Sequence, residues 1–139
     1  MSHDETIRFT VSLPKRLLDE LDEGVTSRGY SSRSELVRDM LRARMVEDAW
    51  GHDEAEVNGV LTIVYDHHRR GLTDRLHRVQ HSKYVHILCT QHLHLDHDHC
   101  LETIVLRGTP GEIERMALEI GGLKGVEFAE LTRTGVVRG

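Results

Sequence analysis

The chain has few of the residues that mark secreted or membrane-spanning proteins. It holds only two cysteines, Cys89 and Cys100, in 139 residues. With no signal-peptide pattern at its start, this argues against a disulfide framework and for a reducing compartment. No apolar run approaches the roughly 18 residues that a membrane span requires. We therefore expect a cytoplasmic protein that does not engage the membrane.

Aromatic residues and positive charge are scarce as well. Aromatic residues make up 4% of the chain and hydrophobic residues 38%, so we expect a modest aliphatic core whose burial an obligate oligomer completes. The formal net charge of −5 argues against a nonspecific nucleic-acid coat protein. It still allows a specific DNA reader with basic residues on one edge. Charged residues, at 29% and well mixed, argue against disorder.

Histidine, in contrast, is abundant. The chain has eleven histidines, and all but two of them lie between His67 and His99. A solvated, histidine-rich surface is the alternative to a binding site for part of this set. Whether further metal sites form there stays open for four of the histidines: His67, His86, His97 and His99.

The sequence His92-Leu93-His94 points to a metal site. Histidines separated by one residue lie on the same face only in an extended strand, and residues 84–95 have the apolar, β-branched content of a strand. A polar turn leads into a second strand, whose antiparallel return would bring the Cys100 sulfur near the two imidazoles. This set favours nickel, copper or zinc over calcium or magnesium. Cys89, of opposite parity, is expected to be buried and to face away from His92 and His94.

Helical periodicity stops near residues 49–56, where a glycine and an acidic run intervene. We therefore expect two domains, residues 1–50 and residues 51–139, in an α+β chain. The second domain has the order βαββαβ, which is the split ferredoxin-like pattern. Its elements are predicted at residues 57–66, 72–79, 84–95, 100–106, 110–120 and 126–131.

The first domain has the pattern of one strand followed by two helices. Residues 7–13 alternate apolar and polar side chains, as a half-buried strand does. Pro14 opens a helix that Gly29 ends, and Ser32 and Glu35 have the spacing of a capping box for a second helix. Because one short strand is not stable alone, we expect it to pair with the same strand of a second copy.

The expected two-stranded ribbon exposes Arg8, Thr10 and Ser12. Such a ribbon fits the major groove of DNA, where Arg8 can bind guanine through two hydrogen bonds and the hydroxyls can contact other bases. The alternative is that these side chains are only the solvent face of an edge strand. The first fifty residues hold ten acidic and eight basic residues. DNA binding should therefore be weak unless something organises it.

Both halves together resemble the nickel-responsive ribbon-helix-helix regulators of the NikR family, over residues 6–131. The motifs that carry the resemblance are Gly-Tyr-x-x-Arg-Ser-Glu at 29–35, Tyr-Asp-His-x-x-Arg at 65–70, Gln-His at 80–81, and the segment 92–102 with its two histidines, Cys100 and Glu102. The resemblance implies an N-terminal ribbon-helix-helix dimer. It also implies a C-terminal ferredoxin-like (ACT-type) domain that forms a homotetramer, as a dimer of dimers.

The resemblance further implies a nickel site. His92, His94 and Cys100 of one subunit would bind one Ni²⁺ per subunit together with His81 of the partner subunit. Three nitrogens and one thiolate in a plane suit low-spin Ni(II), whereas zinc would take a tetrahedron. Glu102 matches a position that supports a ligand or interface histidine.

The resemblance assigns the remaining sites to DNA and to a second cation. Arg8, Thr10 and Ser12 match the positions that read bases. Arg69 and Arg70 match basic residues that contact phosphate from the metal-binding domain. Glu35 and Asp39 match an acidic site at the domain junction that is able to hold K⁺ or another hard cation.

The function predicted from these patterns is that of a nickel-responsive transcriptional repressor. It would bind a palindromic operator on double-stranded DNA when its C-terminal domain carries metal. The alternatives are a cytoplasmic metal-buffering or delivery protein, or a regulator that responds to another transition metal. An enzyme is not expected, because a closed four-ligand site leaves no open position and no paired acid or base stands near the motif.

Overall fold

The computed structural model of the chain describes residues 5–52, 55–81 and 84–136. The chain forms two compact units that divide between Met45 and Val46. This division falls within α2 (Arg33–Trp50), so that helix starts in the first unit and ends in the second. Among the described helices, none has the length and apolar character needed to cross a lipid bilayer.

The N-terminal unit contains α1 (Lys15–Ser27) and the first part of α2. Pro14 directly precedes α1, as predicted, because a missing N–H costs nothing at a helix start. Gly29 follows the helix with a φ of 72°, and the amide of Tyr30 donates to the carbonyl of Val25 at 3.0 Å. Glycine adopts this left-handed conformation without strain, so the helix ends at the predicted place.

The start of α2 has a side-chain cap that differs in one partner from the predicted capping box. The amide of Glu35 donates to Ser32 Oγ at 3.2 Å, which satisfies one of the free amides of the first turn. The Glu35 carboxylate accepts from the amide and the hydroxyl of Ser31, at 2.9 and 2.7 Å. It thus caps the chain one residue earlier than the motif predicts.

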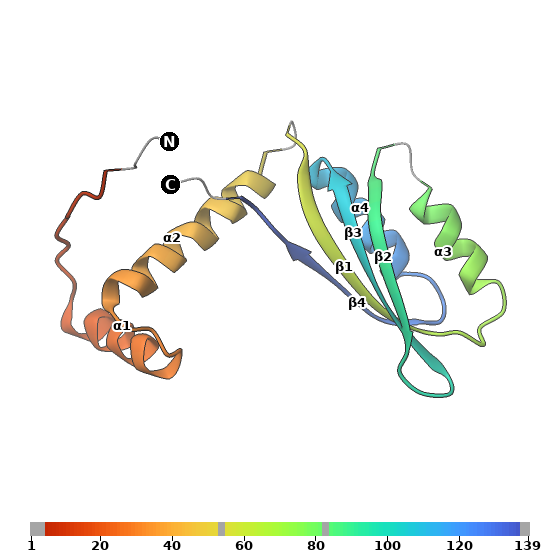
Figure 1. Cartoon of the computed structure of the whole chain (residues 1–139), viewed down its shortest axis with the longest axis horizontal. Helices are drawn as coiled ribbons and strands as arrows, with labels where there is room; N and C mark the ends of the chain where they lie inside the picture. The colour runs from red at the N-terminus through yellow and green to blue at the C-terminus, as the bar shows by residue number, and fades with distance from the viewer. Residues whose placement is uncertain (1–4, 53–54, 82–83, 137–139) are drawn as a thin grey trace. The chain divides into compact units, whose positions relative to one another are not determined.

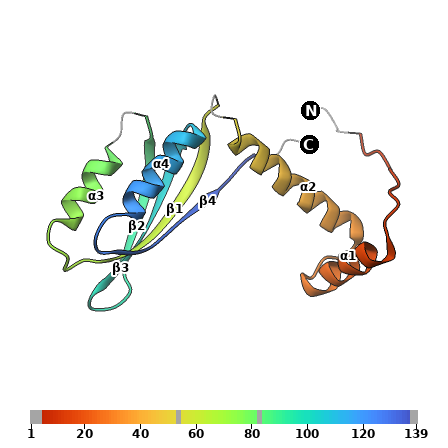
Figure 2. The ribbon, with the colours of Figure 1, turned by 180° about the vertical axis from the view of Figure 1, so that it is seen from behind.

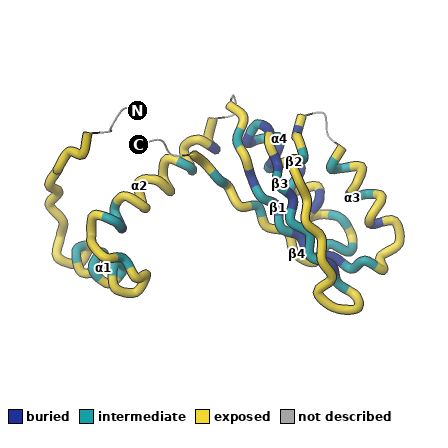
Figure 3. Tube along the Cα trace, in the orientation of Figure 1, coloured by how far each residue is buried: buried dark blue, intermediate teal, exposed yellow. Residues whose placement is uncertain are grey.

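The strand predicted over residues 7–13 is not formed in the single chain, where residues 5–14 are neither helix nor strand. A strand needs a neighbour for its hydrogen bonds, and the four strands of the described chain all lie in the C-terminal unit. Ile7, Phe9 and Val11 are 76%, 72% and 62% exposed, and Figure 3 shows the whole segment before α1 as exposed. Pairing with a second copy therefore stays a prediction.

The C-terminal unit has the predicted βαββαβ order. Its strands are antiparallel and lie in the order β2-β3-β1-β4, as in a ferredoxin-like sheet. Figures 1 and 2 show both helices of this unit on the same face of the sheet. Its elements are β1 (Val57–Asp66), α3 (Leu72–Gln80), β2 (His86–His94), β3 (His99–Gly108), α4 (Pro110–Gly121) and β4 (Val126–Arg133).

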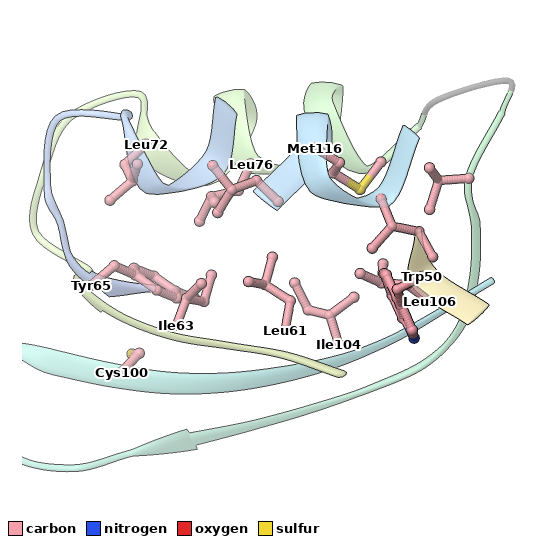
Figure 4. Packing of buried hydrophobic residues seen from close by; sticks show 13 residues of the cluster. Trp50, Leu61, Ile63, Tyr65, Leu72, Leu76, Cys100, Ile104, Leu106 and Met116 are labelled. Atoms are coloured by element: carbon pink, nitrogen blue, oxygen red, sulfur yellow. The ribbon is translucent and has the colours of Figure 1, made fainter. Parts of the chain in front are cut away.

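An aliphatic core fills the space between the sheet and these two helices (Figure 4). Trp50, at the end of α2, is 6% exposed in this core, and its indole N–H donates to the carbonyl of Thr134 at 2.9 Å. The last turn of α2 therefore belongs to the C-terminal unit. Side chains that β1, β3, α3 and α4 bury here include Leu61, Ile63, Ile104, Leu106, Leu72, Leu76, Ile113, Met116 and Ile120.

The other face of the sheet carries neither of the two helices that lie wholly in this unit, α3 and α4. Directly paired residues of antiparallel strands lie on the same face, so the register places Phe128, Val64, Leu101 and Leu93 in one row across all four strands. Phe128 and Leu93 are 46% and 49% exposed. The single chain thus presents an apolar row on an uncovered sheet face.

Candidate metal centre

The β2–β3 hairpin brings the predicted donor residues to one face. His94 pairs with Cys100, and His92 pairs with Glu102. The Cys100 side chain is only 1% exposed, and its Sγ lies 3.2 Å from His94 Nδ1. The predicted antiparallel return of the second strand is therefore confirmed.

A third donor comes from the end of β1 and not from the hairpin. His67, His94 and Cys100 each offer a ligand atom, and these atoms lie within 4.8 Å of one another. The rings of His67 and His94 have centroids 5.5 Å apart. His67 Nδ1 is buried and, among the described residues, has no hydrogen-bond partner. An unpaired buried nitrogen beside a thiol and an imidazole is the donor set that a late first-row metal ion prefers.

Sequence reasoning did not single out His67 as a ligand at this centre, although strand pairing holds the signal for it. Tyr65 pairs with Cys100, and Asp66 pairs with His99. The residue after Asp66 consequently lies beside the hairpin. This pairing joins segments more than thirty residues apart, and periodicity along the chain does not report it.

The other two predicted ligands, His92 and His81, are not part of this group of three. The rings of His92 and His94 are edge-to-face with centroids 5.2 Å apart, but His92 lies outside the group of three. His81 is exposed and forms the C-cap of α3, and it is not part of the group of His67, His94 and Cys100. The resemblance assigns His81 to a site in the partner subunit, which a single chain does not contain.

Burial and nearby negative charge disfavour the thiolate form of Cys100. Burial raises the pKa of the Cys100 thiol, and the charges of Glu102 and Asp96 raise it further. Burial also raises the pKa of Tyr65 to about 12, with Glu102 adding to the effect through its charge and a hydrogen bond. Glu102 therefore sits next to the donor set, opposite His92.

Cys89 corrects one expectation. It lies opposite Val105 in the register, on the face away from His92 and His94, as predicted. It was expected to be buried, but it is exposed. The reason is that β2 is an edge strand and that α3 and α4 both lie on the other face of the sheet.

The residues predicted to contact DNA are exposed. Arg8, Thr10 and Ser12 lie in the segment without regular structure, and Arg69 and Arg70 lie in the turn between β1 and α3. These five side chains are therefore accessible in the single chain.

Glu35 and Asp39, the predicted hard-cation residues, both have partners inside the N-terminal unit. The Tyr30 hydroxyl donates to Asp39 Oδ2 at 2.7 Å, and Arg42 lies 3.2 Å from Asp39 Oδ1. Hydrogen bonds from Ser31 lower the pKa of Glu35. A cation here would have to replace or join these interactions.

Comparisons with known proteins bear on both units. The profile described as "NikR C terminal nickel binding domain" matches residues 58–134, and that of "Ribbon-helix-helix protein, copG family" matches residues 7–47. A Helicobacter pylori (strain Shi470) protein named as a nickel-responsive regulator is 54% identical over 134 residues, covering 94% of this chain and 90% of that protein.

More distant matches differ in strength. A Campylobacter concisus protein of the same name is 50% identical over 133 residues, covering 96% of this chain and 97% of that protein. Among solved structures, the C-terminal domain of MgtC from Mycobacterium tuberculosis covers 60% of this chain and 93% of its own, at 15% identity and a TM-score of 0.48.

Proposed function

This chain belongs to the NikR family of nickel-responsive regulators, and on that premise we propose that it represses transcription by binding a palindromic DNA operator when it carries nickel. The observation that supports this most directly is the grouping of Cys100, His94 and His67 around one point, with an unpaired buried nitrogen. The protein is a regulator and not an enzyme.

We propose that His92, His94 and Cys100 bind one Ni²⁺ per subunit together with His81 of the partner subunit. The hairpin register supports this set, because it places His92 and His94 on the face of Cys100. Glu102, opposite His92, is placed to accept a hydrogen bond from a ligand imidazole and so to orient it. Nickel supplies the positive charge that makes the thiolate favourable in this buried position.

His67 allows a direct test of this proposal, because either His67 or His92 could be the donor that joins His94 and Cys100 within one chain. If the family's ligand set forms in the assembled protein, His92→Ala should remove most of the nickel affinity and His67→Ala should remove little. The reverse result would assign the site to the three donors that one chain gathers. Nickel titration followed by the thiolate absorption band measures both variants.

Exposed apolar side chains in the N-terminal unit support dimerisation through a ribbon of residues 7–13. α1 has no fully buried residue in the single chain, and an open groove in this unit exposes leucines and a methionine that a second copy would cover. Pairing two copies of residues 7–13 would place Arg8, Thr10 and Ser12 on the surface that enters the major groove. The groove is lined in part by Leu13, Leu17, Leu21, Leu36 and Met40.

The C-terminal unit supports assembly into a tetramer, as a dimer of dimers. Its uncovered sheet face carries Phe128, Val64, Leu101 and Leu93 in one row, and burying such a row against a second copy is favourable. A nickel ligand from the partner subunit would then make metal occupancy depend on this interface.

Nickel and DNA must be linked if the protein is a switch. We propose that nickel favours arrangements in which Arg69 and Arg70 reach DNA phosphates, and that K⁺ at Glu35 and Asp39 contributes to the coupling. Linkage then requires operator DNA to tighten nickel binding by the same factor by which nickel tightens DNA binding. We place the protein in the cytoplasm, where its operator is and where thiols stay reduced.

The deciding experiment measures DNA affinity with and without nickel at fixed ionic strength. Duplexes selected from a random pool by the nickel-loaded protein serve as operator, and an unselected duplex serves as control. The proposal requires that nickel increase affinity for the selected duplex. Equal affinity with and without nickel would instead favour a metal-buffering protein, and a response to cobalt, copper or zinc but not nickel would favour a regulator of another metal.

A further inference from the structure

Helix α2 crosses the boundary between the two units and ends on a buried aromatic side chain. The units divide between Met45 and Val46, and α2 ends at Trp50, which is buried in the core of the C-terminal unit (Figure 4). We propose that Trp50 is a positioning residue through which nickel binding in the C-terminal unit affects DNA binding by the N-terminal unit. This inference rests on the proposed nickel-dependent DNA binding.

The polar edge of the indole is held by a carbonyl that is itself fixed to the sheet. The indole N–H donates to the carbonyl of Thr134 at 2.9 Å. The amide and the hydroxyl of Thr134 donate to the carbonyl of Asn58, at 3.3 and 2.7 Å. The side-chain oxygen of Asn58 accepts from Arg107 Nε, on β3, at 3.1 Å. The hydrogen bond of Trp50 is therefore tied to two neighbouring strands.

A charged side chain holds the face of the same ring. The guanidinium carbon of Arg133 lies 5.7 Å from the centroid of the Trp50 ring, a distance at which a cation attracts an aromatic face. Arg133 also donates twice to Glu114 Oε1, on α4, at 3.2 and 3.0 Å. Contacts from β4 and α4 thus fix the last turn of α2 within the C-terminal unit.

Gly59 leaves the space that the indole fills. A Cβ atom at this position of β1 would lie 3.1 Å from Trp50 Cη2 and 3.2 Å from Leu131 Cδ1, both closer than ordinary van der Waals contact. A larger side chain would therefore press on the indole. Near the other end of β1, Tyr65 pairs with Cys100 of the metal centre. One strand therefore contacts both Trp50 and the centre.

Nickel can change DNA affinity only if it favours some arrangements of the chain over others. Because α2 belongs to both units, fixing its last turn makes the course of this helix depend on the C-terminal unit. The alternative is that Trp50 only stabilises the core. A residue of that kind alters stability and nickel affinity, but it leaves the ratio of DNA affinities with and without nickel unchanged.

The test measures this ratio on the selected duplex at fixed ionic strength, for the full chain and its variants. The ratio for the parent should be roughly 5–150, as is usual for coupled sites. In Trp50→Ala it should fall to about one, while nickel affinity, followed by the thiolate band, and DNA affinity without nickel stay unchanged. Trp50→Phe keeps a ring but loses the N–H donor, so its ratio should be intermediate.

Hydrogen exchange gives a readout that needs neither nickel nor DNA. The amides of residues 46–50 should be protected in the parent and lose protection in Trp50→Ala, because the last turn of α2 loses its packing. Ala49→Gln, at an exposed position of the same turn, is the matched control and should keep both the protection and the ratio of the parent. Gly59→Ala, which crowds the indole from β1, should lower the ratio.

The opposite outcomes are distinct. An unchanged ratio or unchanged protection in Trp50→Ala would overturn the inference. If Trp50→Ala also loses nickel binding, Trp50→Phe decides: weaker nickel binding at the parent's ratio would make Trp50 a core residue only. A ratio of one in the parent itself would instead overturn the proposed nickel response, so the two failures are distinguishable.

Discussion

The two units of this chain bury their apolar side chains in different ways. In the C-terminal unit, Ile63 and Ile104 are completely buried within one chain. In the N-terminal unit, α1 buries no residue completely, and Ile7 and Phe9 stay 76% and 72% exposed. The C-terminal unit thus has a core of its own, whereas the N-terminal unit leaves apolar side chains exposed that a second copy would cover in the proposed dimer. A DNA-reading surface built this way depends on assembly, and its stability depends on protein concentration.

The largest expected effect tests whether metal binding belongs to the C-terminal unit alone. Cys100→Ser should abolish the thiolate band and most of the nickel affinity, because it removes the single sulfur donor of the group of His67, His94 and Cys100. Cys89→Ser, on the opposite face, should leave both nearly intact. An unchanged band in Cys100→Ser would contradict the site.

A core substitution tests the self-sufficiency of the C-terminal unit. Ile104→Ala should lower its free energy of unfolding by about 2–5 kcal/mol, because the side chain is completely buried and its removal leaves a cavity. Chemical denaturation followed by the fluorescence of Trp50, the single tryptophan, measures this. Leu118→Ala on α4, where the side chain is 78% exposed, is the matched control and should change stability by no more than about 0.5 kcal/mol.

A substitution in the unpaired segment tests the dependence of the N-terminal unit on a second copy. Phe9→Ala should weaken pairing of the N-terminal units by about 2–4 kcal/mol, as expected for an aromatic side chain buried at an interface. The loss should appear as weaker, more concentration-dependent operator binding. The denaturation midpoint reported by Trp50 should not move. A shifted midpoint would mean that Phe9 packs in the core of the other unit.

Arg8→Ala separates reading of bases from assembly. Loss of a two-hydrogen-bond contact to guanine should cost about 1–3 kcal/mol of specific DNA binding and relax preference at one base pair per half-site. Nickel affinity should stay unchanged, since Arg8 lies in the other unit. Equal weakening on selected and random duplexes would make Arg8 a phosphate contact only.

The smallest expected effect concerns an ion pair inside the N-terminal unit. Arg33 donates to both carboxylate oxygens of Asp22, at 2.6 and 2.8 Å, and this hydrogen bonding lowers the pKa of Asp22 below its usual 3.8. The lowered pKa means that the pair stabilises the folded state above pH 3.8, and that this contribution is lost as pH falls through the lowered value. Asp22→Asn should remove that part of the acid dependence in thermal melts monitored by circular dichroism. Both groups are exposed, so the change should be slight.

Much of the fold could be predicted because the evidence for it is local. Alternation and helical periodicity are properties of neighbouring residues, and they placed β1 at residues 57–66 and the start of α4 at Pro110, as the structure has them. The start of α1 after Pro14 and its end before Gly29 follow from the backbone chemistry of those two residues. The placement of His94 beside Cys100 required only a tight turn between two strands.

What the sequence by itself determined is therefore the set of elements and the donors of the hairpin. Only the tertiary structure decided that His67 joins Cys100, because pairing between β1 and β3 brings it there. Only the tertiary structure decided that Cys89 is exposed, because β2 lies at the sheet edge. Residues 7–13 have the pattern of a strand but form none in a single chain, because they pair with no strand of the described sheet. Periodicity shows on which face of an element a side chain lies. Whether that face is buried or paired depends on the segments packed against it, and these come from distant parts of the chain or from other chains.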